Sequence, residues 1–216
     1  MIPSNGLFSS RWRRALFVAA CLALWFLTQA LIARRPFPEA GIGDGLHRLL
    51  AGPHDFLAGH AGWADALLIA SSAGIDLLAL FLIGSAVFGP SMRPFLGLLV
   101  LFVLRQLCQG LCALPPPQGM IWRYPGFPSL LVTYGTSNDL FFSGHTAIAV
   151  YGAMELGRLG RRWAVPAALL ALFEMAAVLV LRAHYTMDVF AGAASAVCVD
   201  ALIRQASVRG PASGGT

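Results

Sequence analysis

Six apolar segments, each about as long as a bilayer's hydrocarbon core is thick, constrain this sequence more than any other feature. They cover residues 15–33, 66–88, 94–114, 140–157, 163–181 and 184–203. A helix needs about 20 mostly apolar residues to cross a membrane. Only 12% of the 216 residues are charged, against about 25% in soluble domains. The sequence therefore predicts an all-α integral membrane protein, a single domain built as a six-transmembrane-helix bundle, with a flexible tail at residues 204–216.

The distribution of arginine predicts the orientation of this bundle. Three arginines precede the first apolar segment, as in a signal peptide, but its 19-residue run is too long and favours a retained helix. Nine arginines fall on the side that holds both termini and five on the opposite side, which includes the pair Arg34–Arg35. Because cytoplasmic loops carry the excess of basic residues, both termini are predicted to be cytoplasmic.

Charge and cysteine content argue against a nucleic-acid-binding protein, a cysteine metal site and a disulfide framework. The net charge of +5 follows from the arginines that set the topology, so it gives no reason to expect nucleic acid as a partner. All four cysteines lie in apolar segments, and Cys108 and Cys112 share a helix face without a neighbouring histidine. Buried small residues are a better interpretation of them than a metal pair. We expect no disulfide framework, no metal and no cofactor.

Two connecting segments are longer than a simple turn. Residues 41–60 mix leucines with His47, His54 and His60, and are predicted to form a short amphipathic helix along the outer interface. The spacing of these histidines fits no common metal site, so solvated interfacial side chains are expected. The second segment, residues 115–139, is rich in Pro and Gly and is placed to cover a site on the outer side.

Several titratable side chains within the apolar segments gather toward one end of the predicted bundle, whereas Glu155, Glu174 and Asp200 are expected deeper or near the inner face. The fourth segment begins with FFSGHT, which places His145 one or two turns below the outer surface. The sixth begins with RAHYTMD, which places Arg182, His184 and Asp188 at the same depth. Ionisable groups inside a membrane are rare and mostly face the bundle interior or a cavity. We therefore expect the two histidines to meet at one membrane face.

The spacing of His184 and Asp188 indicates how such a site would work. Side chains four residues apart share a helix face, so the carboxylate is expected to accept a hydrogen bond from one imidazole nitrogen. That bond would direct the other nitrogen outward as a base or nucleophile. A protonated His145 opposite would then donate its proton to a leaving oxygen.

Groups suited to phosphate accompany the histidines. Helix N-terminal amides at Ser143 and Gly144 favour an anion, and the guanidinium of Arg182 offers the fork of donors that phosphate oxygens accept. Together these groups predict phosphoryl transfer through histidine. The alternative, histidines that only form hydrogen bonds between packed helices, explains their convergence with an aspartate and an arginine less well.

The two motifs resemble signatures of the lipid phosphatase and phosphotransferase superfamily. Phe142 stands where phosphatidic-acid-type phosphatases carry proline, and the chain has no lysine for their first motif. FFSGHT (141–146), HYTMD (184–188) and LRQLCQGLCALPPP (104–117) are more similar to the sphingomyelin synthases and to the plant phosphatidylcholine:diacylglycerol cholinephosphotransferases. The resemblance covers about residues 104–204.

The resemblance implies roles for the residues of the two motifs. His184 would be the nucleophile and form a phosphohistidine, or else the base that activates the acceptor. Asp188 would orient His184. His145 would handle the leaving or entering oxygen.

Three further residues have a functional and a structural interpretation. Arg105 matches the arginine of the family's LRQ stretch and would bind phosphate; alternatively it pairs with Asp76 or Glu174. Asp139 precedes Ser-Gly-His, as in the family, and could instead cap the following helix. Tyr185 could bind substrate or anchor its helix at the interface.

These features predict a membrane-embedded lipid phosphotransferase. It would move a phospho-headgroup from a glycerophospholipid donor to a lipid alcohol, diacylglycerol or ceramide. The site would face the non-cytoplasmic side, which is the periplasm for a bacterial inner membrane. A lipid phosphatase or phospholipase C-like hydrolase with the same residues is the first alternative, and a small transporter the second. The motifs leave headgroup, acceptor and oligomeric state open.

Overall fold

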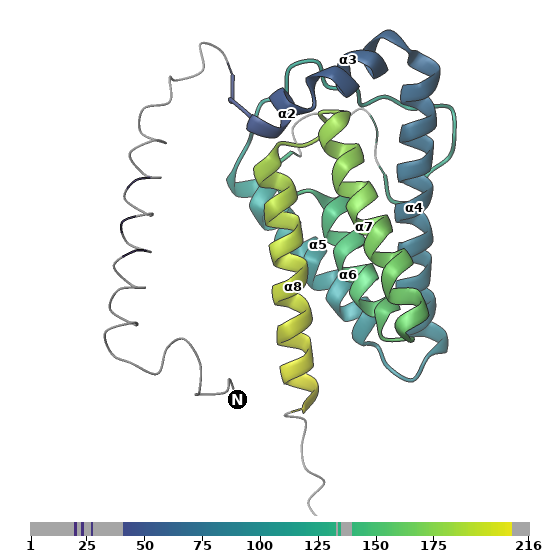
Figure 1. Ribbon diagram of the computed structural model, residues 1–216. Coiled ribbons are helices and arrows are strands. Elements are labelled where there is room, and N and C mark those ends of the chain that lie inside the picture. The colour runs from purple at the N-terminus through teal and green to yellow at the C-terminus, as the bar shows by residue number, and fades with distance from the viewer. Residues whose placement is uncertain are drawn as a thin grey trace, which may run out of the picture. The chain divides into compact units, whose positions relative to one another are not determined.

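The computed structural model describes residues 41–132, 134 and 140–208, together with residues 20, 23 and 27. Regular structure in this part of the chain is entirely helical, which confirms the predicted all-α class there. The helices are α2 (Gly45–Leu49), α3 (Ala51–Gly59), α4 (Ala61–Phe88), α5 (Arg93–Leu111), α6 (Gly144–Gly157), α7 (Arg161–Val180) and α8 (Thr186–Val208) (Figure 1). The predicted first apolar segment, 15–33, lies almost wholly outside the described residues.

Four of the described helices, α4, α5, α7 and α8, are long and apolar enough to cross a membrane. Their outward faces carry exposed large hydrophobic side chains such as Leu77, Leu107, Leu172 and Phe190. Such faces suit a lipid environment, whereas a soluble protein seldom exposes apolar patches of this kind. Four of the predicted segments, 66–88, 94–114, 163–181 and 184–203, therefore correspond to helices of spanning length. The count of six spans stays a prediction.

Helix α6 is the shortest of the bundle and occupies its centre. It is 14 residues long and begins after Ser143, later than the predicted start at residue 140, because the Ser143 side chain caps it. It contacts α4, α5, α7 and α8, and Figure 1 shows it enclosed by these longer helices. A helix surrounded by protein has little contact with lipid, so it can be shorter than the membrane is thick.

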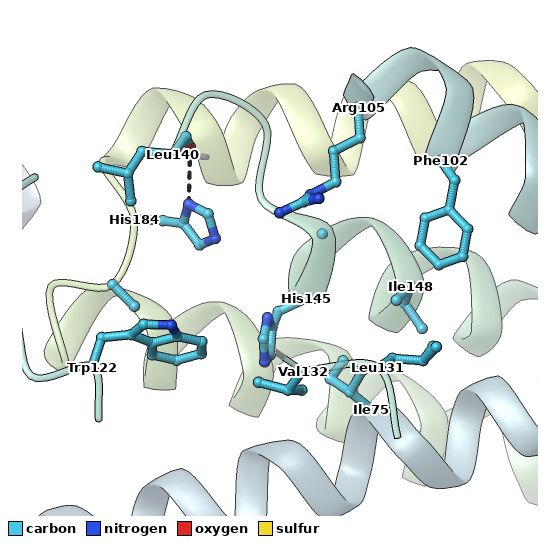
Figure 2. Close-up of a pocket in the computed structure, with 12 residues that line it drawn as sticks. Ile75, Phe102, Arg105, Trp122, Leu131, Val132, Leu140, His145, Ile148 and His184 are labelled. Carbon is cyan, nitrogen blue, oxygen red and sulfur yellow. Dashed lines mark hydrogen bonds between the residues drawn. The ribbon is translucent and has the colours of Figure 1, made fainter. Parts of the chain in front are cut away.

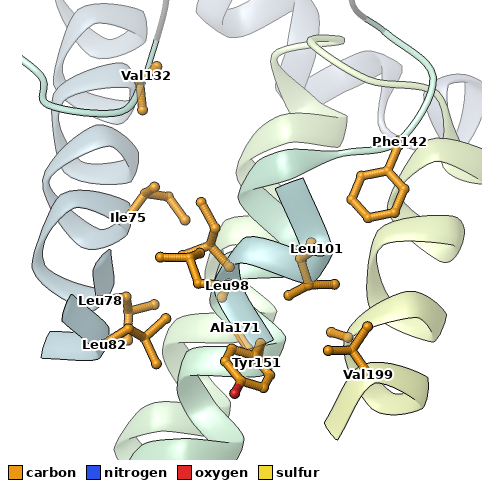
Figure 3. Close-up of a cluster of buried hydrophobic side chains, with 14 residues drawn as sticks. Ile75, Leu78, Leu82, Leu98, Leu101, Val132, Phe142, Tyr151, Ala171 and Val199 are labelled. Atoms are coloured by element: carbon orange, nitrogen blue, oxygen red, sulfur yellow. The ribbon is translucent and has the colours of Figure 1, made fainter. Parts of the chain in front are cut away.

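The main core surrounds α6 and holds side chains from each of its neighbours (Figure 3). In lipid, helices associate through close packing and small residues more than through the hydrophobic effect. Gly97 of α5 fits this rule, because an added Cβ would lie 2.0 Å from the Tyr151 hydroxyl oxygen. Gly192 of α8 fits it too, because its Cβ would lie 2.6 Å from the carbonyl oxygen of Ser143. Close approach of α5 and α8 to α6 therefore depends on these two glycines.

Five charged side chains form an ion-pair network at the end of the bundle where α5 and α7 begin. Its members are Arg93, Glu155, Arg158, Asp200 and Arg204. Arg93 Nη2 lies 2.6 Å from Glu155 Oε2, and Arg158 bridges Glu155 to Asp200. Asp200 is only 4% exposed, and two arginines neutralise it inside the bundle.

Candidate functional site

A cavity of about 150 Å³ lies at the end of the bundle where α6 and α8 begin, which we call the site end. Both histidines of the two sequence motifs line it, as do Arg105 and Gly144. Figure 2 shows the guanidinium of Arg105 and the rings of His145 and His184 directed toward the space between them. The rest of the lining is mostly apolar: Ile75, Phe102, Trp122, Leu131, Val132, Leu140, Ile148 and Ala183.

His145 enters the cavity from the first turn of α6. Ser143 caps this helix, with its hydroxyl oxygen accepting a hydrogen bond from the amide of Thr146 at 3.3 Å. His145 is only 8% exposed, and its ring lies edge-on to the ring of Trp122, with 5.4 Å between ring centres. Its Nε2 atom is buried and has no hydrogen-bond partner among the described residues. A buried polar atom without a partner beside a cavity is a candidate for contact with a ligand.

His184 lies in the turn between α7 and α8 and is held by backbone groups. Its Nδ1 lies 3.0 Å from the carbonyl oxygen of Leu140, drawn as a dashed line in Figure 2. A carbonyl oxygen only accepts, so Nδ1 carries a proton, and in the neutral imidazole Nε2 then keeps its lone pair. No sequence pattern indicates this role for Leu140, because any residue type supplies a backbone oxygen.

Asp188 lies near His184, in a different geometry from the predicted one. Helix α8 begins at Thr186, so His184 precedes the helix and the two side chains do not share a helical face. The closest approach, His184 Nδ1 to Asp188 Oδ2, is 3.6 Å, longer than a hydrogen bond. Asp188 Oδ2 accepts the amide of Tyr185 at 2.9 Å, and its backbone oxygen accepts the amide of Ser143 at 3.0 Å. Asp188 therefore joins the two motifs and adds a negative charge near the imidazole.

Both histidine segments contain a residue in the left-handed region of backbone space. Phe142 has a φ of 84°, three residues before His145, and Arg182 has a φ of 52°, two residues before His184. For residues other than glycine this conformation costs about 1–3 kcal/mol and persists only where the surroundings enforce it. Such residues concentrate at functional sites, in agreement with a site at this cavity.

Arg105 reaches the cavity from α5 across Gly144. A Cβ added at Gly144 would lie 3.1 Å from Arg105 Nε, so a larger residue there would crowd the guanidinium. Asp76 and Glu174, the carboxylates considered as structural partners of Arg105, each accept hydrogen bonds from other groups. Asp76 accepts the amides of the 130–131 segment, and Glu174 accepts the Ser71 hydroxyl at 2.6 Å.

The other candidate residues do not line the cavity, and one falls outside the described part of the chain. Ser143 is buried and serves as the helix cap. Arg182 donates to the carbonyl of Gln118 at 2.9 Å. Tyr185 donates its hydroxyl to the carbonyl of Pro115 at 2.9 Å. These three residues brace the motifs, and Asp139 lies outside the described residues.

The connection after α5 closes one side of the cavity, as its length predicted. It contributes Trp122, Leu131 and Val132 to the lining. The Asp76 carboxylate of α4 accepts the amides of Leu130 at 2.7 Å and Leu131 at 3.0 Å. Backbone amides beside an apolar helix need such partners. Asp76 therefore fixes this cavity wall to α4.

Helices α2 and α3 hold the His184 turn from the other side. His47 and His54 were expected to be solvated, yet they are 8% and 4% exposed. His47 Nε2 donates to the His184 carbonyl at 2.9 Å, and His54 Nδ1 donates to the Val180 carbonyl at 2.8 Å. The third histidine of this segment, His60, is exposed. The expectation failed for two histidines because their partners lie more than 120 positions away in the sequence.

The described residues contain no group of three or more His, Cys, Asp or Glu side chains arranged to hold a metal ion. The charged and titratable groups of the cavity lining are the two histidines and Arg105. Among the described residues, this lining thus offers cationic and neutral donors and no carboxylate. Such a site suits an anionic group, and phosphate in particular.

Comparison with known proteins identifies the family. Neither the curated proteins nor the solved structures contain a significant match to this sequence. The model of the AtPDCT1/2 family matches residues 49–205, which is well over half of the chain and includes both histidine motifs. The chain therefore belongs to the AtPDCT1/2 family, that of the plant phosphatidylcholine:diacylglycerol cholinephosphotransferases.

Proposed function

We propose that this protein transfers a phospho-headgroup from a glycerophospholipid to a lipid alcohol, with His184 as the nucleophile. The observation that carries the proposal is the hydrogen bond from His184 Nδ1 to the Leu140 carbonyl, inside a cavity shared with His145 and Arg105. This bond leaves the lone pair of Nε2 available for attack. Family membership favours the same reaction class.

In the first half-reaction, His184 Nε2 attacks the phosphorus of the donor lipid. The bond between phosphorus and the diacylglycerol oxygen breaks, and a protonated His145 gives its proton to that oxygen. Arg105 bonds the phosphate oxygens on which negative charge develops. The products are free diacylglycerol and a phosphohistidine that carries the headgroup.

In the second half-reaction, an acceptor alcohol enters and neutral His145 removes its proton. The acceptor oxygen attacks the phosphorus, the bond to His184 Nε2 breaks, and His145 returns to its protonated form. One phosphodiester is exchanged for another, so the site must mainly exclude water. The apolar lining and the wall fixed by Asp76 suit that requirement. The alternative in which His184 acts as a base would need no covalent intermediate.

Phosphocholine is the headgroup we infer, from two observations. The family is that of cholinephosphotransferases. In addition, Trp122 lines the cavity beside His145, and an indole face attracts a quaternary ammonium without donating or accepting a hydrogen bond. Diacylglycerol is the acceptor that the family favours, with ceramide as the other candidate. We place the reaction at the non-cytoplasmic face, from the arginine distribution.

The decisive experiment uses the purified full-length protein in liposomes. Phospholipids labelled in the choline, ethanolamine or glycerol headgroup are supplied with diacylglycerol or ceramide of a distinct acyl length. We expect label in a new phospholipid built on the added acceptor, and none with His184→Ala. The matched control is His60→Ala, which removes an exposed histidine at the same end of the bundle.

Two other outcomes would change the conclusion. Label released only as a water-soluble phospho-alcohol would assign the protein to the hydrolases, with the same residues and with water as acceptor. Transfer that survives in His184→Ala would overturn the mechanism. A phosphohistidine trapped by acid-free quenching and mapped to residue 184 would separate the covalent route from the general-base route.

A further inference from the structure

Four hydrogen bonds join α2, α3 and the residue before α2 to the turn that carries His184 and to the helix residues that flank this turn. We call the three side chains that make these bonds the clasp: Asp44, His47 and His54. Their partners are Val180, His184 and Thr186. All four bonds are 2.6–2.9 Å long. The clasp thus fixes the chain before, at and after the histidine.

Asp44 connects two helices through one carboxylate. Its Oδ1 accepts the amides of Leu46 and His47 at the start of α2. Its Oδ2 accepts the amide of Thr186, the first residue of α8, at 2.6 Å, and its Oδ1 accepts the Thr186 hydroxyl at 2.6 Å. A carboxylate at a helix N-terminus satisfies open amides and the positive end of the helix dipole. Asp44 therefore ties the start of α8 to α2.

His47 holds the backbone of the catalytic candidate itself. Its Nε2–H donates to the His184 carbonyl, and its ring stacks on that of Tyr185 with 5.8 Å between centres. The ring of His184 is held separately, through Nδ1, by Leu140. The imidazole is therefore fixed at both its backbone and its ring. Because Arg182 has a positive φ in this turn, the conformation needs such external contacts to persist.

The clasp side chains do not line the cavity. Asp44 and His47 also precede residue 49, where the match to the family model begins. The contacts that connect these two residues to the site are their bonds to His184 and Thr186. We propose that Asp44 and His47 are positioning residues, which fix the His184 imidazole so that Nε2 faces the cavity. This proposal rests on the proposed function, since it assumes that His184 carries the reaction.

The test compares single variants of the full-length protein in the labelled-lipid assay. Asp44→Ala and His47→Ala should lower kcat by about 10- to 100-fold with KM changed less than about twofold, as expected when a reacting group is displaced by an ångström or less. His47→Gln should recover a large part of the activity, because its side-chain amide can donate to the same carbonyl. The controls are Asp55→Ala and His60→Ala, both exposed and in the same segment; they should behave as wild type.

A second readout separates positioning from folding and from the proposed function. Nitrogen-15 NMR of His184 should show the Nδ1-protonated tautomer in the wild type and a mixture in Asp44→Ala and His47→Ala. Lower activity with an unchanged His184 tautomer, or activity that falls only with the fraction of folded protein, would overturn the positioning role. A changed tautomer with unaltered transfer would instead show that His184 does not carry the reaction, and the mechanism given under the proposed function would fail.

Discussion

The two ends of the bundle both bury polar groups, but they satisfy them in opposite ways. At the site end, side chains bond mainly to backbone groups: His184 to Leu140, His47 to His184, and Asp76 to the 130–131 amides. At the other end, the ion-pair network bonds side chain to side chain and joins three arginines to two carboxylates.

This difference distinguishes polar groups that can still react from polar groups that only stabilise the fold. A histidine that donates one ring nitrogen to a carbonyl is oriented and still has its second nitrogen for chemistry. An arginine bonded to a buried carboxylate has its charge neutralised and its donors occupied. The site end is therefore fixed but chemically available, whereas the ion-pair network is fixed and closed. The following predictions test that contrast, with the largest expected effect first.

Replacing His145 should abolish most activity without loss of stability. His145→Gln removes the proton donor and acceptor, so kcat should fall by about 100- to 10,000-fold, the usual contribution of general acid–base catalysis. The melting temperature should stay close to that of the wild type, because Nε2 of His145 makes no hydrogen bond to the described residues. Initial rates and circular dichroism melts would measure the two effects. A stable His145→Gln protein with wild-type activity would show that the cavity at the site end does not use His145 for catalysis.

Breaking the ion-pair network should have the opposite result. Glu155→Ala leaves Arg93 without its partner and takes one of two carboxylates from Arg158. The free energy of unfolding should fall by about 3 kcal/mol, the low end for a broken buried pair because both arginines keep partial exposure. Activity per folded molecule should stay within about twofold of wild type. A large loss of activity at unchanged stability would show that the network takes part in the reaction.

The sequence predicted the helices well where hydropathy determines them. Helices α4, α5, α7 and α8 match predicted segments because each apolar run is long enough to span a bilayer. The ends of the helices were less accurate. Helix α6 starts at Gly144 and α8 at Thr186 because Ser143 and Asp44 cap them, and the Asp44 cap comes from a segment distant in the sequence.

The sequence predicted the side chains that line the candidate site, but it did not predict the groups that hold those side chains in place. His145, His184 and Arg105 stood out because titratable residues are rare in apolar segments. Gly144 stood out because its amide lies at the predicted start of a helix, and all four residues line the cavity. The pairing of His184 with Asp188 assumed a continuous helix, which the turn before α8 interrupts. Backbone oxygens and long-range partners leave no pattern along the chain, so the clasp and the role of Asp76 required the structure.

The cavity wall that Asp76 holds to α4 provides a test of whether the site end excludes water. Asp76→Ala leaves the amides of the exposed Leu130 and the half-buried Leu131 without this acceptor, so the wall is held less firmly to α4. The wall should open more often and admit water, so the ratio of transfer to hydrolysis should fall about tenfold, since tenfold corresponds to about 1.4 kcal/mol. Counting labelled phospholipid against labelled phospho-alcohol gives this ratio. Asp65→Ala is the matched control, because it removes an exposed tether, the 2.7 Å pair with Arg123. An equal fall in both variants would show that any loosening of the connection suffices.

The smallest expected effect is on the pH dependence of the melting temperature. It tests whether the negative charge of Asp44 stabilises the site end. Burial alone would raise the pKa of Asp44, but hydrogen bonds from the side chain and amide of Thr186 and from the amide of His47 hold it below its usual value of 3.8. A carboxyl with a lowered pKa in the folded state stabilises the fold above 3.8, and this contribution is lost as the pH falls through the lowered value. Wild type should therefore melt a few degrees above Asp44→Asn at pH 7, and the gap should close in strong acid. The ion-pair network is present in both proteins, so its own titration cancels from the difference. A gap that stays constant down to the lowest pH would mean that Asp44 acts through its shape and hydrogen bonds, and that its charge contributes nothing to holding the turn.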